Sequence, residues 1–97
     1  MIIAMCGYDG KMGSKIYEFL RKNTSLFEFV LINKKTNDIY EKIKNVDLVV
    51  DFTNRDFTYE VALFCAKNKI PFVSGTTALT NKELEIIYLS PRGKTLN

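Results

Sequence analysis

A glycine-spaced turn behind a short apolar run dictates how this chain can begin to fold. Residues Ile2–Cys6 are all apolar, which is typical of a strand buried on both faces. The run leads directly into Gly7-Tyr8-Asp9-Gly10-Lys11-Met12-Gly13. Beyond it, apolar residues recur at helical spacing to about Lys22, and those expected on one helix face are Met12, Ile16, Phe19 and Leu20. Since glycine tolerates positive φ, the pattern predicts a strand, a tight turn and a helix.

The alternation of strand-like and helix-like patterns continues along the chain. Further strands are predicted at residues 27–32, 47–52 and 71–74, and a helix over 38–44. Another helix is predicted to end near Asn68, with an apolar stripe of Phe57, Val61, Phe64 and Cys65. Another helix is predicted after Thr80-Asn81-Lys82-Glu83, which is a capping box. Short connections between alternating strands and helices favour parallel strands joined by right-handed crossovers. We therefore expect an α/β fold, a truncated Rossmann-type parallel sheet of about four strands with helices on both faces.

Composition excludes several classes of function. The 97 residues contain no histidine, so the chain lacks the commonest general base and the commonest metal ligand. The net charge of +3 is too weak to indicate binding to nucleic acid. No apolar stretch approaches the roughly 18 residues that a membrane span needs. We expect neither a metal site, nor a nucleic-acid partner, nor a membrane.

The two cysteines favour a reducing compartment. Cys6 and Cys65 both lie in apolar runs, so buried thiols are preferred over a disulfide or a reactive thiol. The apolar run at the N-terminus ends at Gly7 and is too short for a signal peptide. The expected location is the cytoplasm.

The turn after the first strand has the chemistry of a phosphate site. The start of a helix presents unpaired N–H groups and the positive end of the helix dipole, and glycine lets a diphosphate approach the backbone. The spacing G-x-x-G-x-x-G between a strand and a helix therefore indicates a dinucleotide, NADPH or NADH. The alternative is that the glycines only make a tight turn. The residues expected to bind the cofactor here are Gly7, Tyr8, Asp9, Gly10, Lys11 and Met12.

The end of the second predicted strand is where a Rossmann-type domain recognises the adenosine ribose. Asn33, Lys34 and Lys35 stand there, and neither Glu28 nor Asp38 is well placed. A carboxylate at this point favours NAD, whereas a cation suits the 2′-phosphate of NADP. We therefore expect NADP to be weakly favoured, with both cofactors accepted. A solvated basic loop is the alternative interpretation of the lysines.

Two more loops follow predicted strands and are expected to meet the glycine turn at the carboxyl edge of the sheet. The cofactor-binding residues expected in them are Phe52 and Thr53 after the third strand, and Gly75, Thr76 and Thr77 after the fourth. Hydroxyls and backbone amides can bind a dinucleotide, and the Phe52 ring can pack against it. The alternative for Thr53 is a helix N-cap, and for Thr76 and Thr77 a turn.

Together, three motifs resemble the dihydrodipicolinate reductase family, the 4-hydroxy-tetrahydrodipicolinate reductases of lysine and diaminopimelate biosynthesis. The motifs are Gly7–Gly13, Val49–Thr53 and Ser74–Thr80, and the resemblance runs from Met1 to about Ile87. It implies an N-terminal domain that binds NADH or NADPH for hydride transfer to a cyclic unsaturated imine dicarboxylate. It also implies that the first motif lines the pyrophosphate, that Asn33 or Lys34 stands at the ribose, and that Phe52 and Thr53 lie near the nicotinamide half. Many members have glycine at the position of Ala78 and a ribose carboxylate that is absent after the second strand here.

The resemblance further implies parts that are absent from these 97 residues. Family members continue into a substrate domain with a paired-histidine, lysine-containing segment and a Ser-Gly-Thr segment, and their oligomer interface is expected in that C-terminal part. We therefore expect residues 1–88 to be an incomplete dinucleotide-binding domain and 89–97 an irregular tail, with no catalytic residue and no turnover by this chain alone. The alternative is a stand-alone nucleotide-binding or interaction module. Without further strands, Phe72 and Val73 are expected on an unpaired edge.

Overall fold

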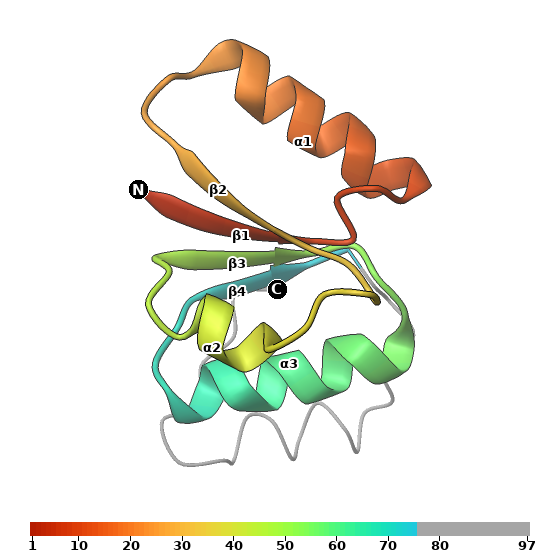
Figure 1. Cartoon of the computed structure of the whole chain (residues 1–97), viewed down its shortest axis with the longest axis vertical. Helices are drawn as coiled ribbons and strands as arrows, with labels where there is room; N and C mark the ends of the chain where they lie inside the picture. The colour runs from red at the N-terminus through yellow and green to blue at the C-terminus, as the bar shows by residue number, and fades with distance from the viewer. Residues whose placement is uncertain (76–97) are drawn as a thin grey trace.

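A computed structural model of the chain describes residues 1–75, which form a parallel sheet with helices on both faces (Figure 1). In chain order the elements are β1 (Ile2–Cys6), α1 (Lys11–Asn23), β2 (Glu28–Ile32), α2 (Ile39–Ile43), β3 (Leu48–Asp51), α3 (Arg55–Lys67) and β4 (Phe72–Ser74). The strands lie in the order β2-β1-β3-β4, and every adjacent pair is parallel. The predicted Rossmann-type fold is therefore confirmed. The helix predicted after Thr80 and the predicted tail lie outside the described residues.

Side chains add hydrogen bonds at the starts of β3 and α3. The strand predicted at 47–52 spans Leu48–Asp51, and Asp47 before it donates its N–H to Ile2 O at 2.8 Å and accepts from the Ile2 N–H through Oδ2 at 2.7 Å. The helix predicted to end near Asn68 spans Arg55–Lys67, and Asn54 Oδ1 accepts from the Phe57 N–H at 3.1 Å. The N-cap is thus Asn54, and the alternative interpretation of Thr53 as the N-cap is wrong.

The sheet separates two apolar clusters of unequal size. Figure 1 shows α1 on one face and α2 with α3 on the other. Alternate residues of β1 point to opposite faces, so Ala4 and Cys6 pack on the side of α2 and α3 while Ile3 and Met5 pack on the side of α1. The larger cluster lies under α3, whose fully buried positions are Thr58, Val61, Ala62, Cys65 and Ala66. Burial of both faces of β1 agrees with its continuous apolar sequence.

The apolar face of α1 differs from the predicted one. Ile16 and Leu20 pack on the sheet as expected, but Met12 is 56% exposed and Phe19 is 63% exposed. Tyr17 takes its place, because residues 13, 16, 17 and 20 follow the spacing i, i+3, i+4, i+7 and Tyr17 reaches Phe29 with ring centroids 5.2 Å apart. The prediction that Phe19 belongs to the buried face was wrong.

Within residues 1–75, β4 pairs only with β3 and forms one edge of the sheet. Phe72 is nevertheless buried, and Val73 is 38% exposed. No helix in this part of the chain is long and apolar enough to cross a membrane.

Candidate dinucleotide site

The topology brings three loops to one end of the sheet. β1 pairs with β2 on one side and with β3 on the other, so the strand order reverses between β1 and β3. Backbone hydrogen bonds extend the sheet past the strand ends, from Gly7 N–H to Ile32 O (2.8 Å), Phe52 N–H to Cys6 O (2.9 Å) and Gly75 N–H to Asp51 O (2.9 Å). In open α/β sheets, ligands bind in the crevice at such a reversal, outside the carboxyl ends of the strands. Gly7, Phe52 and Gly75 all lie there.

Packing alone requires two of the three glycines in the β1–α1 turn. Gly7 has φ of +82°, and a Cβ there would lie 2.6 Å from Phe52 O. A Cβ on Gly13 would lie only 2.0 Å from Gly7 O, so Gly13 lets α1 begin close against the turn. Gly10 is less restricted, since its Cβ would lie 3.3 Å from the same oxygen. The tight-turn interpretation therefore accounts for Gly7 and Gly13.

The first turn of α1 has a positively charged side chain and contains no acidic residue. Its N-cap is Gly10, which has no side chain to accept from the first N–H groups, and the first turn has no acidic residue. Instead it begins with the exposed cation Lys11, which the helix dipole disfavours at this end. α3 is the opposite case, with Asn54 as cap and Asp56 in its first turn. Among the helices of residues 1–75, α1 is the one that combines a first turn without a side-chain cap and a cation at the strand-order reversal, an arrangement that suits a diphosphate.

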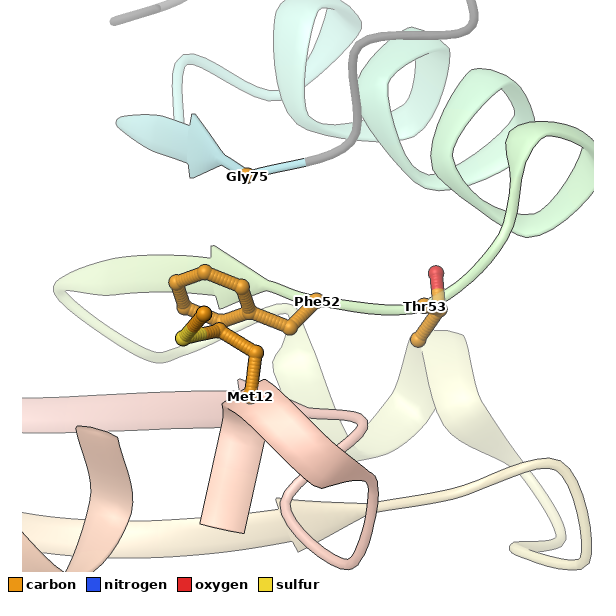
Figure 2. A pocket seen from close by; sticks show the side chains of 4 residues that line it. All are labelled: Met12, Phe52, Thr53 and Gly75. Atoms are coloured by element: carbon orange, nitrogen blue, oxygen red, sulfur yellow. The ribbon is translucent and has the colours of Figure 1, made fainter. Parts of the chain in front are cut away.

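A pocket of about 390 Å³ opens beside this helix start, lined by Met12, Phe52, Thr53 and Gly75. Figure 2 shows Met12 reaching toward the Phe52 ring, with Gly75 on the far side of that ring and Thr53 at the other end of the pocket. A Cβ on Gly75 would lie 2.3 Å from Phe52 Cε1, so glycine is what lets the ring lie against β4. The pocket thus joins an aromatic ring, a thioether and a hydroxyl, which can hold one flat, partly polar group.

A buried carboxylate fixes the loop that forms this pocket. Asp51, fully buried at the end of β3, accepts from Thr53 Oγ1 at 2.5 Å, from Thr53 N–H at 3.2 Å and from Ser74 Oγ at 2.9 Å. Thr58 Oγ1 of α3 donates to its Oδ2. These donors satisfy a charge that would otherwise be costly to bury, and they tie β3, β4 and α3 together. Asp51 therefore sets the position of Thr53 without lining the pocket.

The predicted ribose position is linked directly to the glycine turn. Asn33 Nδ2 donates to Asp9 Oδ2 at 3.1 Å. Lys34 and Lys35 follow on the surface, and both are exposed. Asn33 thus lies beside the glycine turn, and the expected ribose contact of Asn33 or Lys34 stays a prediction.

Burial makes both thiols poor nucleophiles. Cys6 and Cys65 are free and fully buried, as the sequence predicts. Desolvation, with a smaller effect of the nearby Asp51 carboxylate, raises the pKa of Cys65 to about 12 and raises the pKa of Cys6 as well. Neither thiol is suited to covalent chemistry at neutral pH.

The structure places the predicted residues in more than one group. Met12, Phe52, Thr53 and Gly75 line one pocket, while Asp9 and Asn33 form a separate hydrogen-bonded pair. Tyr8 packs with the α1-side cluster, its ring centroid 6.3 Å from that of Tyr17. Thr76 and Thr77 lie outside the described residues. Sequence reasoning missed the roles of Asp51, Thr58 and Ser74, although an aspartate inside the apolar run Val49-Val50-Asp51-Phe52 signals a buried, partnered carboxylate.

The sheet order, its reversal beside β1 and the uncapped helix start define a Rossmann-type α/β domain, a class that binds dinucleotides at this edge. The profile of the family "Dihydrodipicolinate reductase, N-terminus" matches residues 1–90, so the chain belongs to the dihydrodipicolinate reductase family.

Individual relatives agree with this assignment. The chain is 31% identical over 85 residues to a 4-hydroxy-tetrahydrodipicolinate reductase of Campylobacter jejuni subsp. doylei. The alignment covers 88% of this chain and 34% of the relative. It is 30% identical over 96 residues to the Streptococcus suis enzyme of that name, and the alignment covers 86% of this chain and 37% of the relative. It is 28% identical over 89 residues to the enzyme of Caldanaerobacter subterraneus subsp. tengcongensis, with 84% of this chain and 36% of the relative covered. The aligned part is therefore only about a third of the length of these relatives.

Proposed function

We propose that this chain binds NADPH or NADH at the carboxyl edge of its sheet, with the diphosphate at the start of α1. The observation that supports this most strongly is the helix start at Gly10, which has neither a side-chain cap nor an acidic residue and begins with the cation Lys11. The other cofactor-binding residues we propose are Gly7, Tyr8, Asp9, Met12, Asn33, Lys34, Phe52, Thr53, Gly75, Thr76 and Thr77.

The residues present fit such a cofactor. The backbone N–H groups of the first turn of α1 would donate to the phosphate oxygens, and Lys11 would add a charge-assisted contact. Phe52 and Met12 would pack on one flat group of the cofactor while excluding water, and Thr53, held by Asp51, would offer a polar contact. When bound, the reduced nicotinamide supplies a hydride.

Charge favours the cofactor with the additional phosphate. Lys34 and Lys35 are exposed directly beyond the residue that follows β2, where a 2′-phosphate would be placed in a Rossmann-type site. We propose that NADPH is weakly preferred and that both cofactors are accepted.

The reaction that this binding serves is, we propose, that of the relatives, reduction of a cyclic imine dicarboxylate in lysine and diaminopimelate biosynthesis, in the cytoplasm. Hydride transfer needs a second set of groups that hold the acceptor and protonate it. The 97 residues contain no histidine, and the relatives are about three times as long as the part they share with this chain. A protein of these 97 residues alone is therefore expected to bind cofactor without turnover.

Fluorescence of the reduced nicotinamide tests both parts of the proposal. Titration of the 97-residue chain into NADPH and into NADH should give saturable binding of both. No saturable signal with either cofactor at millimolar concentration would contradict the binding site. Loss of the reduced cofactor's absorbance on adding the imine substrate to the pure chain would contradict the expected lack of turnover.

A further inference from the structure

A carboxylate from the glycine turn lies where β2 ends. Asp9 is in the turn between β1 and α1, and Asn33 is the first residue after β2, yet Asn33 Nδ2 donates to Asp9 Oδ2 at 3.1 Å. Gly10, the N-cap of α1, follows Asp9 directly. The backbone of Asp9 therefore adjoins the helix start proposed for the diphosphate, and its carboxylate reaches the end of β2.

The orientation of the Asn33 amide is fixed by the tight turn that follows it. Asn33 Oδ1 accepts from the Lys35 N–H at 2.9 Å and from Thr36 Oγ1 at 3.2 Å. The Asn33 N–H in turn donates to Thr36 Oγ1 at 2.9 Å. Because the amide oxygen already accepts from two donors of its own turn, the amide nitrogen must face outward. Asn33 is thus built to present a donor to Asp9 and to hold that carboxylate in place.

Asp9 is exposed and accepts this one hydrogen bond within the described residues, through Oδ2. A carboxylate near the end of the second strand of a Rossmann-type domain accepts from the 2′-hydroxyl of the adenosine ribose and disfavours a 2′-phosphate. The residues that follow β2 here, Asn33, Lys34 and Lys35, include no carboxylate. The glycine turn supplies one instead.

We propose that Asp9, positioned by Asn33, determines cofactor specificity: its carboxylate accepts from the adenosine 2′-hydroxyl of NADH and repels the 2′-phosphate of NADPH. The proposal rests on the proposed function. Lys34 and Lys35 act in the opposite direction, since their ammonium groups attract the 2′-phosphate. The two effects together explain acceptance of both cofactors, and Asp9 is what keeps NADH competitive.

The test compares Asp9→Asn with Glu28→Gln by measuring Kd for NADH and for NADPH. Both substitutions remove one carboxylate charge from an exposed residue. Glu28, however, is the first residue of β2, whereas Asn33 follows the last residue of that strand. Asp9→Asn should weaken NADH and strengthen NADPH, changing the ratio of the two Kd values about tenfold. Glu28→Gln should leave the ratio within about twofold, because a distant exposed charge is screened.

Asn33→Ala separates the positioning role from the charge. It keeps the Asp9 carboxylate but removes its hydrogen-bond donor, so NADH binding should weaken about threefold or more. An unchanged Kd for NADH would overturn the role of Asn33.

The outcomes distinguish the two proposals. If the unsubstituted chain binds both cofactors and Asp9→Asn leaves the ratio as Glu28→Gln does, the role of Asp9 is overturned while the proposed function stands. If the unsubstituted chain binds neither cofactor, the proposed function is overturned and this inference with it.

Discussion

Asp51 shows how one buried charge organises a surface loop. Its carboxylate accepts from hydroxyls on three segments of the chain, those of Thr53, Thr58 and Ser74. Burying a carboxylate is costly unless donors satisfy its oxygens, and several hydroxyl donors together offset this desolvation. The consequence is a fixed Thr53 at the edge of the pocket, held by a residue that contributes nothing to the pocket surface.

Removing one of these donors should destabilise the fold. Thr58→Val keeps the shape of the side chain but leaves the buried Asp51 with one hydroxyl donor fewer, which should lower the free energy of unfolding by about 1–3 kcal/mol. Urea denaturation measures the change. Thr24→Val is the matched control, because Thr24 Oγ1 accepts only from the Leu26 N–H at an exposed site, and it should cost less than about 1 kcal/mol. Equal losses in the two variants would contradict the network.

The glycines of the first turn should differ in their tolerance of alanine. Gly13→Ala places a Cβ 2.0 Å from Gly7 O, so α1 must move and the free energy of unfolding should fall by about 2 kcal/mol or more. At Gly10 the nearest atom would be 3.3 Å from the Cβ, and the loss should be about 1 kcal/mol or less. Thermal unfolding of the two variants measures this difference. A larger loss at Gly10 than at Gly13 would show that the turn has been wrongly described.

The buried thiols should make the fold sensitive to alkali. Below pH 9.0, the ordinary thiol pKa, both thiols are protonated in the folded and unfolded chain and have no effect on the pH dependence. Above it the unfolded thiols ionise while the folded ones, with raised pKa values, do not. The free energy of unfolding should therefore fall, by up to about 1.4 kcal/mol per pH unit for each thiol.

Urea denaturation at pH 8, 9 and 10 tests this sign. The Cys65→Ala variant should show a shallower decline between pH 9 and 10 than the unsubstituted chain, since one of the two thiols is gone. A decline of the same steepness in both would assign the pH dependence to other groups.

At the scale of elements, the first turn of α1 has a charge that lowers the stability of the helix and favours the proposed binding of an anion. A cation in the first turn of a helix is unfavourable, yet Lys11 stands there and the turn has no acidic residue. Such a departure from a local rule is typical of a functional site. The helix is destabilised by this arrangement, and the diphosphate that we propose binds there would be stabilised by it.

Lys11→Glu should therefore act in opposite directions on stability and affinity. Reversing the charge at the helix start should raise the free energy of unfolding by about 1 kcal/mol, while NADPH binding should weaken about tenfold or more. Lys15→Glu makes the same change in net charge one turn later, where the dipole effect has faded, and should alter both quantities much less. Urea denaturation and NADPH titration on both variants measure the pair of effects. A fall in both the free energy of unfolding and the NADPH affinity of Lys11→Glu would contradict these opposite effects.

The elements also show where sequence reasoning succeeds. The sequence correctly predicted β1 to β4, because each predicted apolar run covers the whole length of its strand. It misjudged Phe19, since a stripe of apolar residues does not say which aromatic finds a partner, and Tyr17 finds Phe29 across the interface. The alternative interpretation of Thr53 as the N-cap of α3 was also wrong: Thr53 and Asn54 can both cap a helix, but Thr53 Oγ1 donates to Asp51 and Asn54 Oδ1 accepts from the Phe57 N–H. Hydrogen bonds between distant segments, such as Asp9 with Asn33, have no pattern in a single sequence.

At the scale of the whole molecule, the sheet assembles a site from segments that are far apart in sequence. The residues of the pocket come from α1, from the loop after β3 and from the residue after β4, and only parallel pairing brings them to one edge (Figures 1 and 2). The described residues of the three motifs recognised in the sequence lie at this edge, so the sequence predicts which loops meet there, whereas the contacts between their side chains come from the structure.

The central claim is that the backbone amides at the start of α1 bind the diphosphate of a dinucleotide. Amide NMR of the isotopically labelled 97-residue chain, titrated with NADPH, tests it most directly. If the diphosphate binds there, the amide signals of residues 10–13 should shift together and saturate, while those at the capped start of α3, Asp56 and Phe57, should shift much less. Saturable binding with unshifted signals at residues 10–13, or with the largest shifts at the start of α3, would contradict it.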